Sequence, residues 1–218
     1  MSVLAIDFGK SKCGYAIGTL FVSESGTVRT SEIIEKTKRF EKIAVGLPLS
    51  MSGNYSTQTF EAIKFALKLK KMGKSVFFID ERMTTKMAKT FSKTDDDRFS
   101  AEQLLLEYLN NPSNSIEFKL SRLELEEEIS CQTVLFIEVP FNDRITFENA
   151  LVYSKDPYIA YTHFETGSFV YRVWKDLNDK IKTLEKKPDL VIINKDCRQL
   201  LSNLEFSSDV LLVDVKYE

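Results

Sequence analysis

The chain has 218 residues, of which 43% are hydrophobic and 28% are charged, and this composition excludes a disordered or fibrous protein. No apolar run reaches the roughly 18 residues that a membrane span needs, and the opening residues MSVLAIDFGK lack the basic start of a signal peptide. The three cysteines, Cys13, Cys131 and Cys197, are too scattered for a disulfide framework or a zinc motif. We therefore expect a reduced, cytoplasmic protein.

The net charge of −2 conceals two halves of opposite sign. Residues 1–112 carry a net charge of +4, whereas residues 113–218 carry −6. The basic half encloses three consecutive acids, Asp95, Asp96 and Asp97. A basic half around clustered acids suits a metal-dependent enzyme that acts on a polyanion, although solvated lysine faces are the more common cause of such a balance.

The first half is predicted to alternate strands and helices. Apolar runs indicate five strands, at 3–6, 13–17, 28–34, 43–45 and 76–79. Apolar residues at helical spacing indicate three helices, at 57–72, 84–91 and 101–109. This order is typical of an α/β domain.

The second half is predicted to repeat this order. Its expected strands are at 134–139, 150–153, 158–162, 190–194 and 210–215, and its expected helices at 169–184 and 197–204. The run VLFIEVP at 134–140 parallels VLAIDFG at 3–9, and VLLVD at 210–214 parallels VFFID at 76–80. We therefore predict a degenerate copy of the first half, although buried strands also resemble one another by chance.

Two domains are expected on these grounds. The first covers residues 1–112, and a smaller α/β domain covers 130–218. Between them, 113–129 contains a run of glutamates and is interpreted as a charged linker or an exposed helix.

Acidic residues stand where the predicted strands end. Asp7 ends the first strand, Asp80 and Glu81 follow another, and Asp97 leads into a helix. Hydrolysis of a phosphodiester with two metal ions needs carboxylates from different elements to converge on the cations. Carboxylates suit Mg²⁺ and Mn²⁺ because these hard ions prefer oxygen ligands.

Four motifs sharpen this interpretation: DFGKSKCGYAIG at 7–18, VGLPLSMSG at 45–53, DERMTT at 80–85 and DRFSAEQLLLEYL at 97–109. In this order and at these separations, they resemble the motifs of the YqgF/RuvX family of Holliday-junction-resolvase-like proteins. The resemblance covers about half of the chain. It implies an α/β, ribonuclease-H-like mixed sheet flanked by helices, and a nuclease site that uses Mg²⁺ or Mn²⁺.

The resemblance also assigns roles to single residues. Asp7, Glu81 and Asp97 become the catalytic residues and the metal ligands, with Asp80 in support. Substrate binding is assigned to Gly9, Lys12, Arg82, Thr84 and Thr85. Lys12 stands where the family usually has arginine, which keeps the charge but loses the bidentate geometry.

Each acid also has a structural interpretation. Asp7 could simply end a strand, and Glu81 could pair with a neighbouring cation. Asp97 could cap a helix, and Asp95 or Asp96 could replace it as the third ligand.

The favoured function is a divalent-metal-dependent nuclease that hydrolyses phosphodiester bonds in structured nucleic acid, either precursor ribosomal RNA or branched DNA. Two other classes stay open. One is an actin-like phosphotransferase or scaffold, because Asp7-Phe8-Gly9-Lys10 resembles a phosphate-binding turn; no second glycine-rich loop supports it. The other is a non-catalytic nucleic-acid-binding protein. We expect the C-terminal half to pack against the first half or to bind a protein partner.

Overall fold

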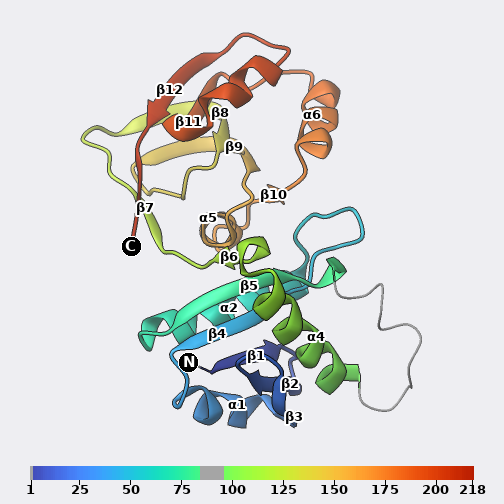
Figure 1. Ribbon diagram of the computed structural model, residues 1–218. Coiled ribbons are helices and arrows are strands. Elements are labelled where there is room, and N and C mark those ends of the chain that lie inside the picture. Colours follow the sequence, from blue (N-terminus) through green and yellow to red (C-terminus); the bar gives the residue numbers. More distant parts are fainter. Residues whose placement is uncertain (1, 84–95) are drawn as a thin grey trace. The chain divides into compact units, whose positions relative to one another are not determined.

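The computed structural model describes residues 2–83 and 96–218 (Figure 1). It divides into two compact units. The first consists of Met1–Met51 and Ser56–Phe118, and the second of Ser52–Tyr55 and Lys119–Glu218. The helix predicted at 84–91 lies outside the described residues.

The first unit is built on a six-stranded mixed sheet. Its strands are β1 (Val3–Asp7), β2 (Lys12–Gly18), β3 (Val22–Arg29), β4 (Lys42–Leu47), β5 (Ser75–Asp80) and β6 (Ile116–Glu117), in the spatial order β3-β2-β1-β4-β5-β6. The pairs β1/β2 and β2/β3 are antiparallel, whereas β1/β4 and β4/β5 are parallel. This order and these directions confirm the predicted ribonuclease-H-like sheet.

The helices of this unit are α1 (Thr30–Thr37), α2 (Thr57–Lys71) and α4 (Asp96–Asn110), with short 3-10 turns η1 (Glu81–Met83) and η2 (Pro112–Asn114). The α2 helix begins at a capping box, in which Ser56 and Thr59 each accept the other's backbone N–H. It ends before Gly73, whose φ of 80° suits glycine. The α1 helix and β3 replace the single strand predicted at 28–34.

Small side chains line the face of the sheet that α4 covers. Val3, Ala5, Ala16 and Ala44 are buried against a face of α4 that includes Leu104. Because strand side chains alternate between faces, the intervening positions of β1 point to the other face. There α2 packs against β4 and β5, and Figure 1 shows α4 and α2 on opposite sides of the sheet. The short side chains let α4 approach closely, which places its first turn near the end of β1.

The second unit contains a five-stranded sheet and a two-stranded ribbon. The strands of the larger sheet are β8 (Ile129–Ile137), β9 (Ile145–Tyr153), β10 (Val170–Tyr171), β11 (Leu190–Asn194) and β12 (Asp209–Val213), in the spatial order β10-β9-β8-β11-β12. The other elements are the paired β7 (Ser121–Leu123) and β13 (Val215–Tyr217), the helices α5 (Pro157–Phe164) and α6 (Trp174–Thr183), and the 3-10 run η3 (Lys195–Asn203).

The predicted duplication is not confirmed. The order β10-β9-β8-β11-β12 matches β3-β2-β1-β4-β5 of the first unit. However, β8/β9 and β9/β10 are parallel, whereas the corresponding pairs of the first unit are antiparallel. The second sheet is therefore parallel throughout.

The strand predicted at 158–162 is wrong, because these residues belong to the helix α5. Asp156 caps this helix by accepting the backbone N–H groups of Tyr158 and Ile159. Pro157 occupies the first turn, where its missing N–H costs nothing. These two start signals outweigh the aromatic and β-branched side chains that suggested a strand.

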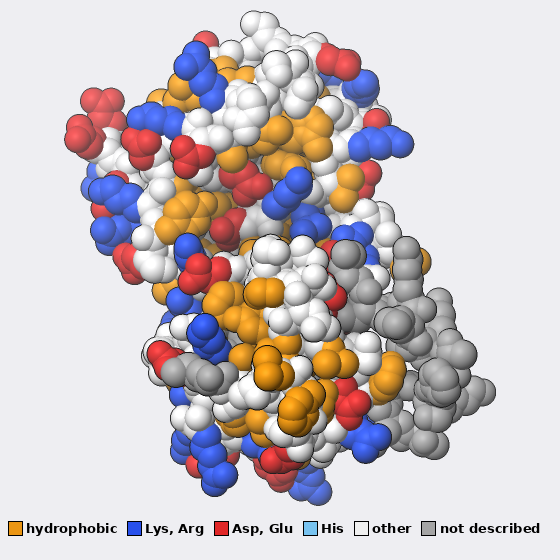
Figure 2. Space-filling model, in the orientation of Figure 1, with side chains coloured by type: hydrophobic (Ala, Val, Ile, Leu, Met, Phe, Trp, Pro, Cys, Tyr) orange, Lys and Arg blue, Asp and Glu red, His pale blue; other side chains and the backbone are white. Residues whose placement is uncertain are grey.

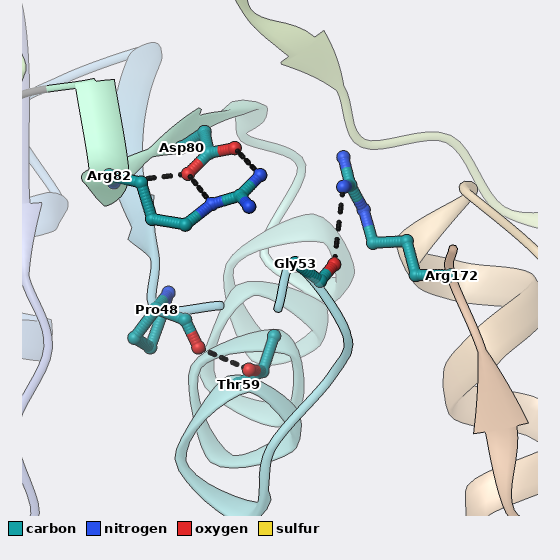
Figure 3. Close-up of polar contacts among 6 residues, drawn as sticks. All are labelled: Pro48, Gly53, Thr59, Asp80, Arg82 and Arg172. Atoms are coloured by element: carbon teal, nitrogen blue, oxygen red, sulfur yellow. Dashed lines mark hydrogen bonds and ion pairs between the residues drawn. The ribbon is translucent and has the colours of Figure 1, made fainter. Parts of the chain in front are cut away.

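A side chain from Ser52–Tyr55 forms part of the second unit. The Asn54 carboxamide oxygen accepts the backbone N–H groups of Arg172 and Val173, at 3.0 and 3.1 Å, and its nitrogen donates to Asp176. The α6 helix has no side-chain cap of its own at Val173. Asn54 therefore orders the start of α6, and the Gly53 carbonyl accepts a further bond from the Arg172 guanidinium (Figure 3).

None of the helices in the described part of the chain has both the length and the apolar character of a membrane span. The three cysteines are free. On the face seen in Figure 2, Lys and Arg are interspersed with Asp and Glu and form no continuous basic surface. That face therefore adds nothing to the polyanion argument made from net charge.

Candidate active site

The predicted acids lie at one edge of the first sheet. Asp7 is the last residue of β1 and Asp80 the last residue of β5, with β4 between these strands. Because β1, β4 and β5 are parallel, their carboxyl ends share an edge. Glu81 opens η1 directly after β5, and Asp97 lies in the first turn of α4. Three separate elements therefore supply the three predicted ligands.

The carboxylates lie close enough for their charges to act on one another. The pKa of Asp7 is raised to about 6, first by burial and then by the charge of Asp97, while a hydrogen bond from Ser100 opposes the rise. The pKa of Glu81 is raised to about 8, first by burial and then by the charges of Asp7 and Asp80. Asp7 and Glu81 thus resist ionisation, first because they are buried and then because neighbouring side chains are acids too.

Two glycines allow this close approach. A Cβ at Gly46 of β4 would lie 2.3 Å from the Glu81 Oε1 atom and 3.1 Å from the Leu104 Cδ1 atom. A Cβ at Gly14 of β2 would lie 1.8 Å from the backbone oxygen of Asp97. Both distances are far inside van der Waals contact, so only glycine lets Glu81 and α4 reach these positions.

The predicted substrate-binding cations are both engaged with acids. Arg82 donates from Nε and Nη2 to the two carboxylate oxygens of Asp80, at 3.0 and 2.7 Å (Figure 3). The Arg82 backbone N–H also bonds this carboxylate, at 3.0 Å. The Lys12 ammonium lies 2.6 Å from the Asp97 Oδ2 atom. Both cations therefore lie beside the cluster formed by Asp7, Asp80, Glu81 and Asp97, which we call the acidic edge.

Gly9 has a structural role in the turn between β1 and β2. A Cβ at Gly9 would lie 2.4 Å from the carbonyl oxygen of Lys12. The Gly9 carbonyl accepts a hydrogen bond of 2.7 Å from the Thr30 hydroxyl, which ties the turn to α1. The other two residues predicted to bind substrate, Thr84 and Thr85, lie outside the described residues. So does Asp95, and the side chain of Asp96 is not described.

A hollow of about 350 Å³ opens beside the end of β1, lined by Phe8, Gly9, Lys10, Thr57, Gln58 and Glu61. It lies between the turn after Asp7 and the start of α2, and none of the three predicted metal ligands lines it. A larger hollow, of about 800 Å³, lies at β3 and α1, lined by residues such as Glu24 and Arg39. Because none of the predicted site residues lines the larger hollow, we assign the chemistry to the acidic edge.

Sequence analysis also missed Ser100. It follows Asp97 by three residues and so lies on the same face of α4, one turn further on. Its hydroxyl bonds the Asp7 carboxylate. The three-residue spacing of Asp97 and Ser100 within DRFSAEQ could have indicated that both side chains lie on the face of α4 near Asp7.

The donor set fits a divalent cation. Asp7, Glu81 and Asp97 offer hard oxygen ligands, and their mutual repulsion is what a bound cation would relieve. The buried Asp97 Oδ2 atom, 2.6 Å from the Lys12 ammonium, receives no well-aligned hydrogen bond among the described residues. In residues 2–83 and 96–218, no three Asp, Glu, His or Cys side chains are yet arranged to enclose a metal ion.

Comparison with known proteins places the chain. A family model described as "RuvX: Holliday junction resolvase" matches residues 1–111. A Thermotoga maritima protein named "Putative pre-16S rRNA nuclease" is 32% identical over 215 residues, which cover 93% of this chain and 90% of that protein. The chain belongs to the RuvX family.

Other relatives match about half of the chain. A Rickettsia bellii protein of the same name is 30% identical over 132 residues, covering 50% of this chain and 86% of that protein. Among solved structures, Thermus thermophilus RuvC in complex with a Holliday junction substrate aligns with a TM-score of 0.39 at 13% identity. That alignment covers 54% of this chain and 99% of RuvC.

Proposed function

We propose that this RuvX-family protein is a divalent-metal-dependent nuclease that hydrolyses phosphodiester bonds in structured nucleic acid. The observation that carries the proposal is the coupled acidic edge, where burial and neighbouring charges raise the pKa of Asp7 to about 6 and of Glu81 to about 8. Such shifts cluster at functional sites, because a purely structural edge gains nothing from acids that repel one another.

Asp7, Glu81 and Asp97 are the proposed ligands. A bound Mg²⁺ or Mn²⁺ supplies charge stabilisation to the attacking and leaving oxygens of a phosphodiester. Without a cation, Glu81 keeps its carboxyl proton at neutral pH, because its pKa is about 8. A cation held by Glu81 would therefore displace this proton. Ser100 orients Asp7 throughout, because its hydroxyl bonds the Asp7 carboxylate.

Arg82 is proposed to meet the substrate. Its two hydrogen bonds to Asp80 hold the guanidinium group at the acidic edge. A planar guanidinium matches the geometry of a phosphate group. Its side chain is 37% exposed, so it is reachable by a polyanion.

Structured precursor ribosomal RNA is the proposed substrate, on the strength of the name of the Thermotoga maritima relative, which matches nearly the whole chain. Branched DNA is the second candidate, because the family model is described as a Holliday junction resolvase. We further propose a cytoplasmic location, in keeping with three free cysteines. A protein partner for the C-terminal half stays a prediction.

Cleavage of end-labelled precursor 16S rRNA and of four-way DNA junctions, with and without Mg²⁺ or Mn²⁺, tests the proposal. The wild type is compared with Asp7→Asn and with Glu61→Gln. Glu61 is the matched control, because its carboxylate pairs with Lys10 at 3.7 Å outside the cluster of acids. We expect metal-dependent cleavage by the wild type and Glu61→Gln, and loss of at least about 100-fold in Asp7→Asn. Equal cleavage by all three proteins, or none by folded wild type, would contradict the proposal.

A further inference from the structure

Lys12 faces the acid that is proposed as the third metal ligand. It is the first residue of β2, and its ammonium nitrogen lies 2.6 Å from the Asp97 Oδ2 atom. The resemblance to the family gave Lys12 only a contact with substrate. The position of its charge points to a different role, which rests on the proposed metal-dependent function.

The packing of α4 against β2 brings Lys12 and Asp97 close together. Lys12 and Gly14 are two residues apart on β2, so their side-chain directions share one face of the strand. At Gly14 the backbone of Asp97 comes so near that a Cβ would lie 1.8 Å from its carbonyl oxygen. With the start of α4 held against this face, the Asp97 side chain lies beside Lys12.

The environment of Asp97 makes the ammonium group its main counter-charge. The Oδ2 atom is buried and lies 2.6 Å from the Lys12 ammonium, an ion pair that takes the place of a well-aligned hydrogen bond within the described ranges. The Lys12 side chain is 63% exposed, and because a lysine ammonium is carried on a flexible four-carbon stem, it can move away from Asp97. A single positive charge therefore occupies an oxygen that a divalent cation would need.

We propose that Lys12 is an internal counter-ion of the acidic edge, which pairs with Asp97 in the metal-free protein and is displaced when a divalent cation binds. Pairing keeps Asp97 oriented and limits the repulsion between Asp97 and Asp7. Displacement leaves the ammonium at the rim of the loaded site, where it can approach a substrate phosphate. Metal loading thereby precedes the contact between Lys12 and substrate.

Two other roles give different outcomes. If Lys12 only binds substrate, its removal leaves metal affinity unchanged. If Lys12 mainly holds Asp97 in place for the metal, its removal weakens metal binding. If Lys12 is a counter-ion that competes with the metal for Asp97, its removal increases metal affinity.

Lys10 offers a matched control two residues away. Its ammonium pairs with Glu61 at 3.7 Å, and its side chain is 71% exposed. Replacing Lys10 removes the same charge from the same turn but leaves Asp97 paired. Any general effect of net charge on metal binding therefore shows equally in the Lys10 and Lys12 variants.

The experiment is a Mn²⁺ titration of the full-length protein without nucleic acid, followed by the electron paramagnetic resonance signal of free Mn²⁺. The variants are Lys12→Met, Lys12→Gln, Lys12→Arg and Lys10→Met, each checked for folding by circular dichroism. We expect Lys12→Met and Lys12→Gln to bind Mn²⁺ about three- to tenfold more tightly than the wild type, as expected for one nearby charge in a partly screened site. Lys12→Arg and Lys10→Met should stay close to the wild type.

Unchanged or weaker Mn²⁺ binding by both neutral Lys12 variants would overturn the counter-ion role while leaving the nuclease proposal intact. Tighter binding by Lys10→Met as well would also overturn it, because the effect would then come from net charge. Absence of Mn²⁺ binding by the folded wild type would overturn the metal site itself, and the counter-ion role with it.

Discussion

The hydroxyl of Ser100, on α4, hydrogen-bonds the carboxylate of Asp7 at the end of β1. This contact connects the helix that covers the sheet with the strand that supplies the first proposed ligand. It opposes the rise in the Asp7 pKa that burial and the Asp97 charge produce. Ser100 is therefore a positioning residue that favours the ionised form of Asp7.

Ser100→Ala is expected to raise the pKa of Asp7 further, because it removes the contact that favours the carboxylate. The acid limb of Mn²⁺ binding against pH should move upward by roughly half to one pH unit. Mn²⁺ titrations between pH 5 and pH 8 measure this shift, and Ser100→Thr, which keeps the hydroxyl, should restore the wild-type limb. Identical limbs for wild type and Ser100→Ala would mean that the hydrogen bond has no influence on the site.

Gly46→Ala is expected to displace Glu81, because the added Cβ would lie 2.3 Å from its Oε1 atom. Metal-dependent cleavage should fall by at least about tenfold, since small displacements of catalytic groups are costly. Gly26→Ala is the control: its Cβ would lie 2.9 Å from the Tyr15 hydroxyl oxygen, which is not part of the proposed metal site. The measurement compares the cleavage rates of the two variants at saturating Mg²⁺. Equal rates would show that Gly46 does not set the position of Glu81.

Glu81 should make the metal-free protein less stable as the pH rises. The folded-state pKa of about 8 lies above the ordinary value of 4.5, so the folded state binds the proton more tightly. This stabilisation is complete below about pH 4.5 and is lost as the pH rises through about 8. Glu81→Gln removes the ionisable proton, so its gain in free energy of unfolding over the wild type should be larger at pH 8 than at pH 5, by on the order of 3 kcal/mol.

Urea denaturation in EDTA at the two pH values measures the Glu81 effect. Added Mg²⁺ should reduce the difference, because the cation takes over the compensation of charge. A constant difference between Glu81→Gln and wild type at pH 5 and pH 8 would contradict the coupled edge.

His163, in the second unit, should act in the opposite direction. Its ring is fully buried against Phe136, and its Nε2 atom lies 2.8 Å from the Val139 carbonyl oxygen, which requires the proton on Nε2. Burial lowers the pKa of His163 from 6.5 to about 4, so stability is complete above pH 6.5 and is lost as the pH falls toward 4.

His163→Gln keeps a hydrogen-bond donor but takes up no proton. When the pH falls from 7.5 to 5, the free energy of unfolding of the second unit should decrease by about 2 kcal/mol more in the wild type than in the variant. Trp174 is the only tryptophan and begins α6, so its fluorescence during urea denaturation reports on this unit. Parallel pH dependence in wild type and variant would show that His163 does not cause the acid sensitivity.

The sequence predicted the placement of the candidate acids in the first sheet better than it predicted the strand directions of the second unit. Asp7, Asp80 and Glu81 follow buried strands directly, so a local pattern places them at a sheet edge. The parallel direction of β9 has no such local signal, because apolar residues alternate in the same way in either direction. The contact of Asn54 with Arg172 joins residues 118 positions apart, and only the folded chain shows that a distant asparagine orders α6.

The location of bound Mn²⁺ tests the central claim most directly. Crystals grown with Mn²⁺ and measured near the manganese absorption edge would show the ion as an anomalous scattering peak. The account predicts a peak about 2.1 Å from carboxylate oxygens of Asp7, Glu81 and Asp97, with the Lys12 ammonium moved away from Asp97. A peak elsewhere, or none at these three acids with Mn²⁺ present in the crystal, would contradict the proposed nuclease centre.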